Sequence, residues 1–535
     1  MHLVDKLPGY GKRVGLITTA AAAALLCACG SPPAPDSGAV TAPEPSAVER
    51  PIKVITSGGF TAAFETLAPL FEQATGIEIE TVHGSSMGGG PQSMPVRLSQ
   101  GEAADLLIFN DQAYADLDAA GYLRPQTRVD LGESVIGMSV RSGAPKPDIS
   151  TREAFIAALR DAESIGYSAS VSGTYLSTVA FPALGIWEEI EPKTKRIMTE
   201  RVASAVARGE VEIGFQAVSE ILSIEGADFV GTIPEELQQV STFLAVVAER
   251  AENPEGAARL IDFLSSQAAA GVIESTGLRP LRRSSRLSAA SGSVSEAGEV
   301  KVITSGGFTA AFDVLGPIFA QATGVELATE YGSSMGGGPQ SIAVRLERGE
   351  TADILIMNRP PLDQLAAAGR VRPNARVDLG RSLIGMAVRS GAPKPDISTR
   401  EALIATLLAA ESIGYSASVS GTRLSNEIFP SLGIWEQIEP KSQRVFTERV
   451  AEVVARGEVE IGFQQVSAIL PVEGADFAGL LPDELQEVAF FSAGIMAQAA
   501  NPDNAQRLVA FLSSAAAAPI IEATGLTPVV AAWAP

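Results

Sequence analysis

The chain has 535 residues, 46% of them hydrophobic and 19% charged, with a formal net charge of −22 at pH 7. These values predict a folded protein of two to four domains and argue against nucleic acid as a partner, because phosphate-binding surfaces need clustered Lys and Arg. The cysteine and histidine counts, two of each, exclude a disulfide framework and Cys/His zinc sites, and we expect neither a metal nor a cofactor.

The N-terminus has the pattern of a secretory signal. Residues 1–28 combine a basic beginning with a short apolar run at 14–26. The run ends in the sequence LCAC at 26–29, which resembles a bacterial lipobox in which Cys29 is lipidated. A plain signal peptide or an uncleaved anchor is the alternative. Lipid on one residue would hold the protein at a membrane surface without spanning it, so we expect a periplasmic or cell-surface protein anchored through Cys29.

Residues 29–50 are rich in Pro, Ser and Ala and have no apolar period. Such a composition predicts an extended tether, with a reach on the order of 50–60 Å at about 3.1 Å per residue.

The rest of the chain is a tandem duplication. The sequences ITSGGFTAAF and GSSMGGGPQS occur at 55–64 and 84–93, and both recur unchanged at 303–312 and 332–341, an offset of 248 residues in each case. We call residues 51–281 repeat one and residues 300–530 repeat two, with 282–299 as a flexible linker. The period is far longer than that of stacked solenoid repeats, so a whole domain pair is duplicated.

Within repeat one, strand and helix patterns alternate along the chain. Strands are expected at 52–56, 77–81, 105–109, 134–140, 164–169, 211–216 and 242–248, and helices at 61–74, 151–162, 200–208 and 255–274. This alternation predicts an α/β fold with an open, largely parallel sheet. About 230 residues per repeat suggests two lobes with a ligand in the crevice at the strand ends.

Hydroxyl- and glycine-rich turns follow several of these strands. Ser57, the pair Ser85 and Ser86, and the Ser172–Thr174 turn each stand where a strand ends and a helix begins. Such turns present backbone N–H groups and hydroxyls to an anion, so we predict one anion-holding cleft per repeat. The alternative is ordinary helix capping, which favours Ser with or without a ligand.

The order and spacing of these motifs carry a resemblance. The signature is an apolar strand and small-residue turn, a Ser-Ser turn, ADLLIFN, SGTY, a G-x-W segment and EIGFQ, and in this order each repeat resembles a type II periplasmic solute-binding protein of the molybdate-binding group. The resemblance covers nearly all of both repeats. It implies two tandem Venus-flytrap units, each closing two lobes on a small oxyanion for delivery to an ABC transporter permease.

The resemblance also implies ligand contacts from four turns of each repeat. The implied positions are, in repeat one, Ser57, Gly58, Gly59, Ser85, Ser86, Ser172, Thr174, Tyr175, Thr199 and Gln216, and in repeat two, Ser305, Gly306, Gly307, Ser333, Ser334, Ser420, Thr422, Arg423, Thr447 and Gln464. No catalytic residue is assigned.

Two departures from the molybdate pattern keep a second ligand class open. Gly59 stands where the family's first turn carries its ligand serine, and Gln216-Ala217 stands where a tyrosine usually closes the pocket. The same overall pattern, including the SGGF turn, resembles aconitate isomerase, an enzyme on this fold. A small di- or tricarboxylate is therefore the alternative to a molybdate- or tungstate-like oxyanion.

Differences between the repeats fall near the predicted pockets. Tyr175 is replaced by Arg423, His83 by Tyr331, Asp111 by Arg359 and Tyr114 by Leu362. An added guanidinium favours a planar carboxylate, so the two clefts are expected to differ in affinity or ligand unless these changes are neutral drift.

Binding and catalysis make different demands on the cleft. Binding needs only matched donors, whereas an isomerase needs a base of tuned pKa within reach of the substrate. The nearest candidates for a base are Tyr175, His83 and Glu200, and repeat two keeps only the glutamate, as Glu448. The sequence therefore favours a binding protein over an enzyme, and a scavenger without a transporter is a third possibility.

Overall fold

The computed structural model describes residues 50–198, 200–281, 298–334, 338–417, 419–446, 448–486 and 488–530. The predicted signal peptide with Cys29, the tether up to residue 49 and the linker from 282 to 297 lie outside the described residues, as do Thr199 and Thr447. Among the described residues, no helix is both long enough and apolar enough to cross a bilayer.

Each repeat consists of two α/β lobes. The first lobe of repeat one contains β1 (Ile52–Thr56), β2 (Ile79–His83), β3 (Leu106–Asn110), β4 (Val129–Ser134), β10 (Ser241–Val247), β11 (Arg279–Pro280), α1 (Thr61–Thr75), α2 (Met94–Ser99), α3 (Tyr114–Ala119), α10 (Pro254–Leu264) and α11 (Gln267–Ser275). Its second lobe contains β5 (Ile136–Arg141), β6 (Ile165–Ser168), β7 (Thr194–Ile197), β8 (Ile213–Ala217), β9 (Ala227–Thr232), α4 (Arg152–Asp161), α5 (Val171–Tyr175), α6 (Phe181–Ala183), α7 (Trp187–Ile190), α8 (Val202–Ala207) and α9 (Val218–Ile221).

Repeat two has the same two lobes. Its first lobe contains β12 (Val300–Ser305), β13 (Leu327–Gly332), β14 (Ile354–Asn358), β15 (Val371–Ser382), β21 (Ala489–Met496), β22 (Thr527–Pro528), α12 (Gly306–Thr323), α13 (Ile342–Glu347), α14 (Arg359–Ala367), α21 (Pro502–Leu512) and α22 (Ala518–Ala523). Its second lobe contains β16 (Ile384–Arg389), β17 (Ile413–Ser416), β18 (Ser442–Val445), β19 (Ile461–Gln465), β20 (Ala475–Leu480), α15 (Arg400–Ala409), α16 (Val419–Arg423), α17 (Phe429–Ser431), α18 (Trp435–Ile438), α19 (Val450–Ala455) and α20 (Val466–Ile469).

The sheets are mixed rather than largely parallel, which corrects the expectation from sequence. The strand order in repeat one is β11-β4-β10-β3-β1-β2 in the first lobe and β7-β6-β8-β5-β9 in the second. β1 pairs in parallel with β2 and β3, whereas β10 is antiparallel to both of its neighbours, β3 and β4. The reason is the chain path: β10 enters the first lobe from the second, so it runs opposite to strands that start within the first lobe.

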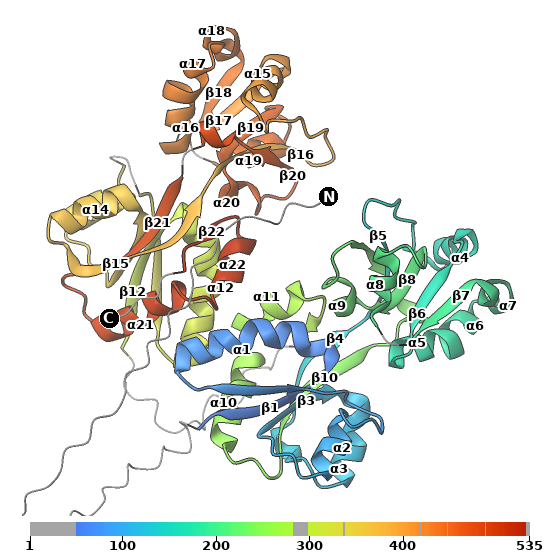
Figure 1. The fold of residues 1–535 in the computed structure, drawn as a ribbon. Helices are drawn as coiled ribbons and strands as arrows, with labels where there is room; N and C mark the ends of the chain where they lie inside the picture. Colours follow the sequence, from blue (N-terminus) through green and yellow to red (C-terminus); the bar gives the residue numbers. More distant parts are fainter. Residues whose placement is uncertain are drawn as a thin grey trace, which may run out of the picture. The chain divides into compact units, whose positions relative to one another are not determined.

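Strand β3 is apolar on both faces, which explains the uninterrupted run predicted at 105–109. Leu106 and Ile108 point to the core under α1, α10 and α11, and Leu107 and Phe109 point to the core under α2 and α3. Figure 1 shows α1 along one side of this sheet and α2 and α3 on the other. A strand buried on both faces needs apolar residues at every position, not at alternate ones.

The second lobe of repeat one has a separate core organised by aromatic rings. Phe155 and Phe181 both contact Phe215 edge-on, with ring centroids 5.6 and 5.7 Å apart. Phe429 makes the corresponding edge-on contact with Phe463 in repeat two, at 5.8 Å. Such aromatic pairs stabilise a folded protein by about 0.5–1.5 kcal/mol each beyond the effect of their buried area. Each second lobe therefore has its own hydrophobic core.

The chain crosses between the lobes twice, and one glutamine joins the crossings. In the first crossing β4 leads directly into β5, and the expected strand 134–140 corresponds to β5 except at its start, where Ser134 is the last residue of β4. Gln238, in the return crossing, accepts a hydrogen bond from Ile136 N (2.9 Å) and donates one to Ile136 O (2.7 Å). Gln486 makes the same pair of bonds with Ile384 in repeat two. These bonds fix the two crossing segments to each other at the base of the cleft.

The expected helix at 255–274 is two helices. α10 ends at Leu264, and Ser266 caps α11 by accepting a hydrogen bond from Ala269 N at 3.2 Å. Ser at an N-cap competes with helix continuation, and the pair Ser265-Ser266 therefore breaks the helix.

Candidate functional site

The first turn presents a buried, unpartnered hydroxyl in each repeat. Ser57 follows β1, is 2% exposed, and its backbone N–H donates to Ile108 O at 2.9 Å. Among the described residues its Oγ has no hydrogen-bond partner, and the same holds for Ser305, also 2% exposed. The capping explanation does not apply here, because neither side chain caps the helix that follows. A buried hydroxyl without a partner is costly unless a ligand or water supplies one.

Aromatic packing fixes the glycine two residues later. A Cβ atom on Gly59 would overlap the ring of Phe243, and one on Gly307 would overlap the ring of Phe491. The position where the molybdate pattern has a serine is thus closed to any side chain. Ser57 and Ser305 remain the only hydroxyls that residues 57–60 and 305–308 offer.

The second turn is held by its own serines. Ser86 Oγ accepts a hydrogen bond from Asn110 N at 3.0 Å, and Ser334 Oγ accepts one from Asn358 N at the same distance. Ser93 Oγ donates to Gly88 O (2.7 Å) and Gly90 O (2.8 Å), which folds the glycine-rich loop back on itself. Ser86, the second serine of the turn, therefore links the segment after β2 to the end of β3. Its Oγ is the acceptor in this bond, so its hydroxyl proton can be donated to another group.

The third turn is a cluster of hydroxyls on the second lobe. Ser168 Oγ lies 2.6 Å from Ser170 Oγ and 3.3 Å from Ser172 Oγ. A Cβ atom on Gly173 would overlap Ser168 O, so only glycine lets the turn pack this closely on β6. Thr174 is not part of this cluster of serine hydroxyl contacts. Its Oγ1 accepts a hydrogen bond from Arg196 Nη2 at 3.3 Å.

In repeat two these turns meet at a cavity between the lobes. The cavity measures about 470 Å³. It is lined by Ser305, Gly306, Gly307, Ser333, Ser334, Asn358, Ser416, Ala417, Ser420, Val445, Phe446, Glu448, Arg449, Gln464, Gln465, Ala468 and Phe491. All sequence-predicted positions of repeat two are therefore present except Thr422 and Arg423, which do not line it, and Thr447, which is outside the described residues.

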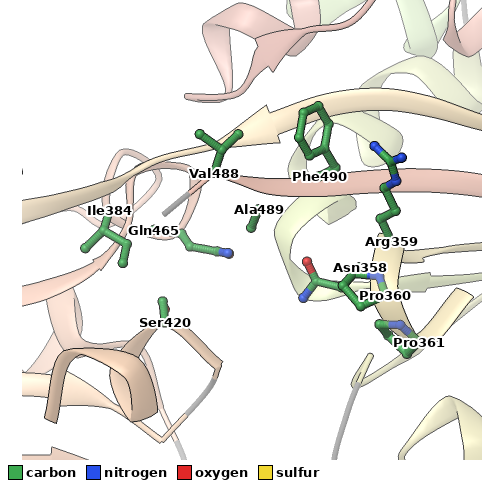
Figure 2. Close-up of a pocket in the computed structure, with 10 residues that line it drawn as sticks. All are labelled: Asn358, Arg359, Pro360, Pro361, Ile384, Ser420, Gln465, Val488, Ala489 and Phe490. Atoms are coloured by element: carbon green, nitrogen blue, oxygen red, sulfur yellow. The ribbon is translucent and has the colours of Figure 1, made fainter. Parts of the chain in front are cut away.

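A smaller cavity of about 130 Å³ adjoins the first and shares Asn358, Ser420 and Gln465 with it. Figure 2 shows the side-chain amides of Asn358 and Gln465 pointing toward each other across this space. Arg359 lies at its edge, with its guanidinium carbon 5.4 Å from the ring centre of Phe490 and its Nη1 3.2 Å from Asp378 Oδ2. Asn358 is thus a lining residue of both cavities.

Arg423, predicted to add a guanidinium to the cleft of repeat two, does not line either cavity in this structure, and its Nε lies 3.2 Å from Glu427 Oε2, one helical turn away. The cationic side chain that does line the cavity is Arg449, which the sequence reasoning missed. Arg201 is its counterpart in repeat one.

The candidate bases named from sequence are engaged elsewhere. His83 Nε2 lies 3.6 Å from Glu65 Oε1 on the surface. Glu200 is paired with Arg208 at 2.6 Å, and the hydrogen bond from Arg208 lowers the pKa of the Glu200 carboxyl. Tyr175 OH lies 3.5 Å from Gln238 O, beside the lobe crossing.

A carboxylate that sequence reasoning missed is Glu220 on α9. Its counterpart in repeat two is Ala468, which lines the larger cavity. Burial raises the pKa of the Glu220 carboxyl, and the charge of Arg201 opposes that shift. The signal available in the sequence was the replacement of a carboxylate by alanine between two otherwise matching repeats.

The comparisons with known proteins agree with this architecture. A family model described as bacterial extracellular solute-binding protein matches residues 52–279 and again 300–527. An aconitate isomerase from Pseudomonas sp. is 40% identical over 230 residues, which is 43% of this chain and 88% of that protein.

Solved structures with a similar fold include two from molybdate systems. The substrate-binding domain of a putative molybdenum ABC transporter from Clostridium difficile matches 44% of this chain and all of that chain, at 16% identity and a TM-score of 0.38. The periplasmic molybdate-binding protein of Azotobacter vinelandii matches 43% of this chain and all of that chain, at 19% identity and a TM-score of 0.35. Because the family model covers both repeats, the protein belongs to the bacterial extracellular solute-binding proteins and carries two units of that family in tandem.

Proposed function

We propose that each repeat binds a small anion in the cleft between its two lobes. The observation that carries this proposal is the buried Oγ of Ser57 and of Ser305 at the end of the first strand, each without a hydrogen-bond partner in the part of the chain that the structure describes. Hydroxyls from the Ser-Ser turn and from the second lobe supply further donors, and closure of the lobes would remove the anion from water.

A small di- or tricarboxylate is the ligand class we favour. The 40% identical relative is an aconitate isomerase, so a tricarboxylate is the ligand of a protein that resembles one repeat over most of its length. Arg449 in repeat two gives a carboxylate the planar, charged donor that it pairs with best. A di- or tricarboxylate ligand is also compatible with an enzymatic activity.

A molybdate- or tungstate-like oxyanion is the second candidate. The observation in its favour is the number of neutral donors in the cavity, among them Ser305, Ser333, Ser334, Ser420 and Gln464. A tetrahedral oxyanion can be held by hydroxyls and amides alone, without a counter-charge. In this case the protein would deliver its ligand to an ABC transporter permease.

The place of action we propose is the extracytoplasmic side of a membrane, with a lipid on Cys29 as the anchor. The family description and the LCAC sequence at 26–29 support this proposal. In cells that make the protein, Cys29→Ser should move it from the detergent phase to the aqueous phase after Triton X-114 partition. Retention of the variant in the detergent phase would contradict a lipid anchor.

Thermal denaturation of the full chain with separate anions tests the binding proposal. A ligand at a hundredfold excess over its Kd stabilises its repeat by about 2.7 kcal/mol. We expect cis- or trans-aconitate to raise the melting temperature saturably, with citrate, molybdate, tungstate, sulfate and phosphate compared at equal ionic strength. A shift with molybdate or tungstate alone would replace the carboxylate by an oxyanion, and no shift with any of these anions would contradict small-anion binding.

A further inference from the structure

Glu220 lies against the first turn of repeat one. It is on α9 of the second lobe, which contacts the turn η2 (Gly58–Phe60) of the first lobe. A Cβ atom on Gly58 would be 4.0 Å from Glu220 Oε1. Gln216 Nε2, from the strand that precedes α9, donates to Glu220 Oε2 at 3.5 Å. The carboxylate therefore stands directly beside the turn that carries the unpartnered Ser57 hydroxyl.

Repeat two shows that this position belongs to the cleft. Gly306 and Ala468, the counterparts of Gly58 and Glu220, both line the 470 Å³ cavity. A Cβ atom on Gly306 would have no neighbour within 4 Å. The space that is open beside the first turn of repeat two is therefore occupied by a carboxylate in repeat one.

The environment of Glu220 suits a group that gains and loses a proton. Its burial raises the pKa of the carboxyl above the ordinary value, and Arg201 is the charged group that acts against this shift. Arg201 is itself held by a hydrogen bond from Nη1 to Ser223 Oγ at 2.7 Å. Within the described part of the chain, no ion pair includes Glu220, in contrast to Glu200 with Arg208 and Glu448 with Arg456. A base works best when its pKa lies near the working pH.

We infer that the two clefts differ in kind: Glu220 transfers a proton on an unsaturated di- or tricarboxylate bound in repeat one, whereas repeat two, with Ala468, binds such a ligand without converting it. This inference rests on the proposed binding of a carboxylate ligand beside Ser57. Glu448, the carboxylate that does line the cavity of repeat two, is held by Arg456 at 2.8 Å.

The proposed step is an internal proton shift. The ionised Glu220 carboxylate removes a proton from an sp³ carbon next to the double bond, and the electron pair of the broken C–H bond spreads over the allylic carbons and the attached carboxylates. The Glu220 carboxyl exchanges this proton with solvent, and Glu220 then delivers a proton to the carbon at the far end of the allylic unit, where a new C–H bond forms. The double bond has moved by one position, and no oxidant or reductant is consumed.

The test follows cis- and trans-aconitate with the full chain in D₂O by NMR, together with calorimetric binding. For the wild type we expect interconversion of the isomers with deuterium incorporation at carbon. For Glu220→Gln we expect the rate to fall at least about a hundredfold while binding is kept, since a general base contributes about 10²–10⁴. Glu225→Gln, an exposed carboxylate of the same lobe, is the matched control and should keep the wild-type rate.

Further variants guard against a folding defect. Glu220→Asp keeps the carboxylate one methylene further away and should retain a reduced rate, with a thermal midpoint measured for every variant. Ser305→Ala, in repeat two, should weaken one of the two binding equivalents about tenfold or more. An unchanged rate in Glu220→Gln, or aconitate binding by the wild type without deuterium exchange, would overturn the inference and leave the binding proposal intact. An absence of aconitate binding would overturn the carboxylate proposal and this inference together.

Discussion

At the scale of single residues, the first turn of each repeat is shaped by what stands opposite it. Gly307 faces the ring of Phe491, which is 2% exposed and packed in the first-lobe core. Its neighbour Gly306 faces open space. The two adjacent glycines therefore have different roles. Gly307 is required because the Phe491 ring packs against it, whereas Gly306 leaves space in the cleft unfilled.

This difference gives a matched pair of substitutions. Gly307→Ala should lower the free energy of unfolding by about 1–3 kcal/mol, because a methyl group must displace a packed ring. Gly306→Ala should be neutral or slightly stabilising at the start of α12. Urea denaturation of the full chain, followed by circular dichroism, measures both. Equal effects of the two substitutions would contradict the packing explanation.

Glu220 makes stability depend on pH in a defined direction. A carboxyl with a raised pKa in the folded state binds its proton more tightly there than in the unfolded chain. Its contribution to stability is therefore complete below the unfolded pKa and is lost as the pH rises through the folded pKa. Glu220→Gln removes this loss.

The measurement is the melting temperature of Glu220→Gln and wild type between pH 4 and pH 8. We expect the melting temperature of Glu220→Gln to increase steadily relative to that of the wild type as the pH rises, because only the wild type must bury a charge. Glu225→Gln should run parallel to the wild type over the same range. A constant difference between Glu220→Gln and wild type would show that Glu220 is not desolvated.

At the scale of elements, one buried aspartate joins three segments of the first lobe. Asp105, 1% exposed at the start of the β3 region, accepts hydrogen bonds from Lys53 N (2.8 Å), Glu252 N (2.6 Å) and Asn253 N (2.7 Å). It thereby links β1, β3 and the approach to α10. Asp353 accepts the equivalent bonds from Lys301 N and Asn501 N in repeat two.

Asp105→Ala should therefore lower the free energy of unfolding by about 3 kcal/mol or more, because three backbone donors lose their acceptor at about 1–3 kcal/mol each. Asp116→Ala, on an exposed face of α3, should change it by less than about 0.5 kcal/mol. Urea denaturation of the full chain distinguishes the two variants. A small effect of Asp105→Ala would mean that water replaces the carboxylate.

The elements also show what sequence patterns can and cannot predict. The run at 105–109 was predicted as a buried strand, because apolar residues on both faces leave a continuous run. The role of Asp105 was not predictable, since two of its partners lie 147 and 148 residues away in the chain. The parallel direction assigned to the sheet was wrong for the same reason: the direction of β10 depends on which strands it joins.

The candidate site was predictable where it consists of turns. Ser57 and Ser305 were proposed because a hydroxyl directly after an apolar strand falls at the sheet edge, and in the described part of the chain both Oγ atoms are buried and have no hydrogen-bond partner. The ion pair of Arg423 with Glu427 could not be predicted, because it depends on where the helix places the two side chains. Glu220 was missed because its position beside the Gly58 turn follows from the fold, and the one signal in the sequence was its replacement by Ala468 in repeat two.

At the scale of the whole molecule, duplication provides an internal comparison. Ser57 and Ser305 occupy equivalent positions, and among the described residues neither buried Oγ has a hydrogen-bond partner, which supports the proposal that both clefts hold an anion. Glu220 and Ala468 make the surroundings of the two ligands different. A chain of this kind can keep ligand binding in one unit while the other unit acquires a second property.

The most direct test of two anion clefts is the stoichiometry of binding to the full chain, measured by isothermal titration calorimetry with trans-aconitate and, in parallel, molybdate. We predict two equivalents of one of these anions for the wild type. Ser57→Ala and Ser305→Ala should each weaken one site about tenfold or more, the loss of one hydrogen bond to a charged ligand, so that one tight equivalent remains. Ser99→Ala, at an exposed position, should keep two. Absence of saturable binding of either anion, or two tight sites in both serine variants, would contradict the account.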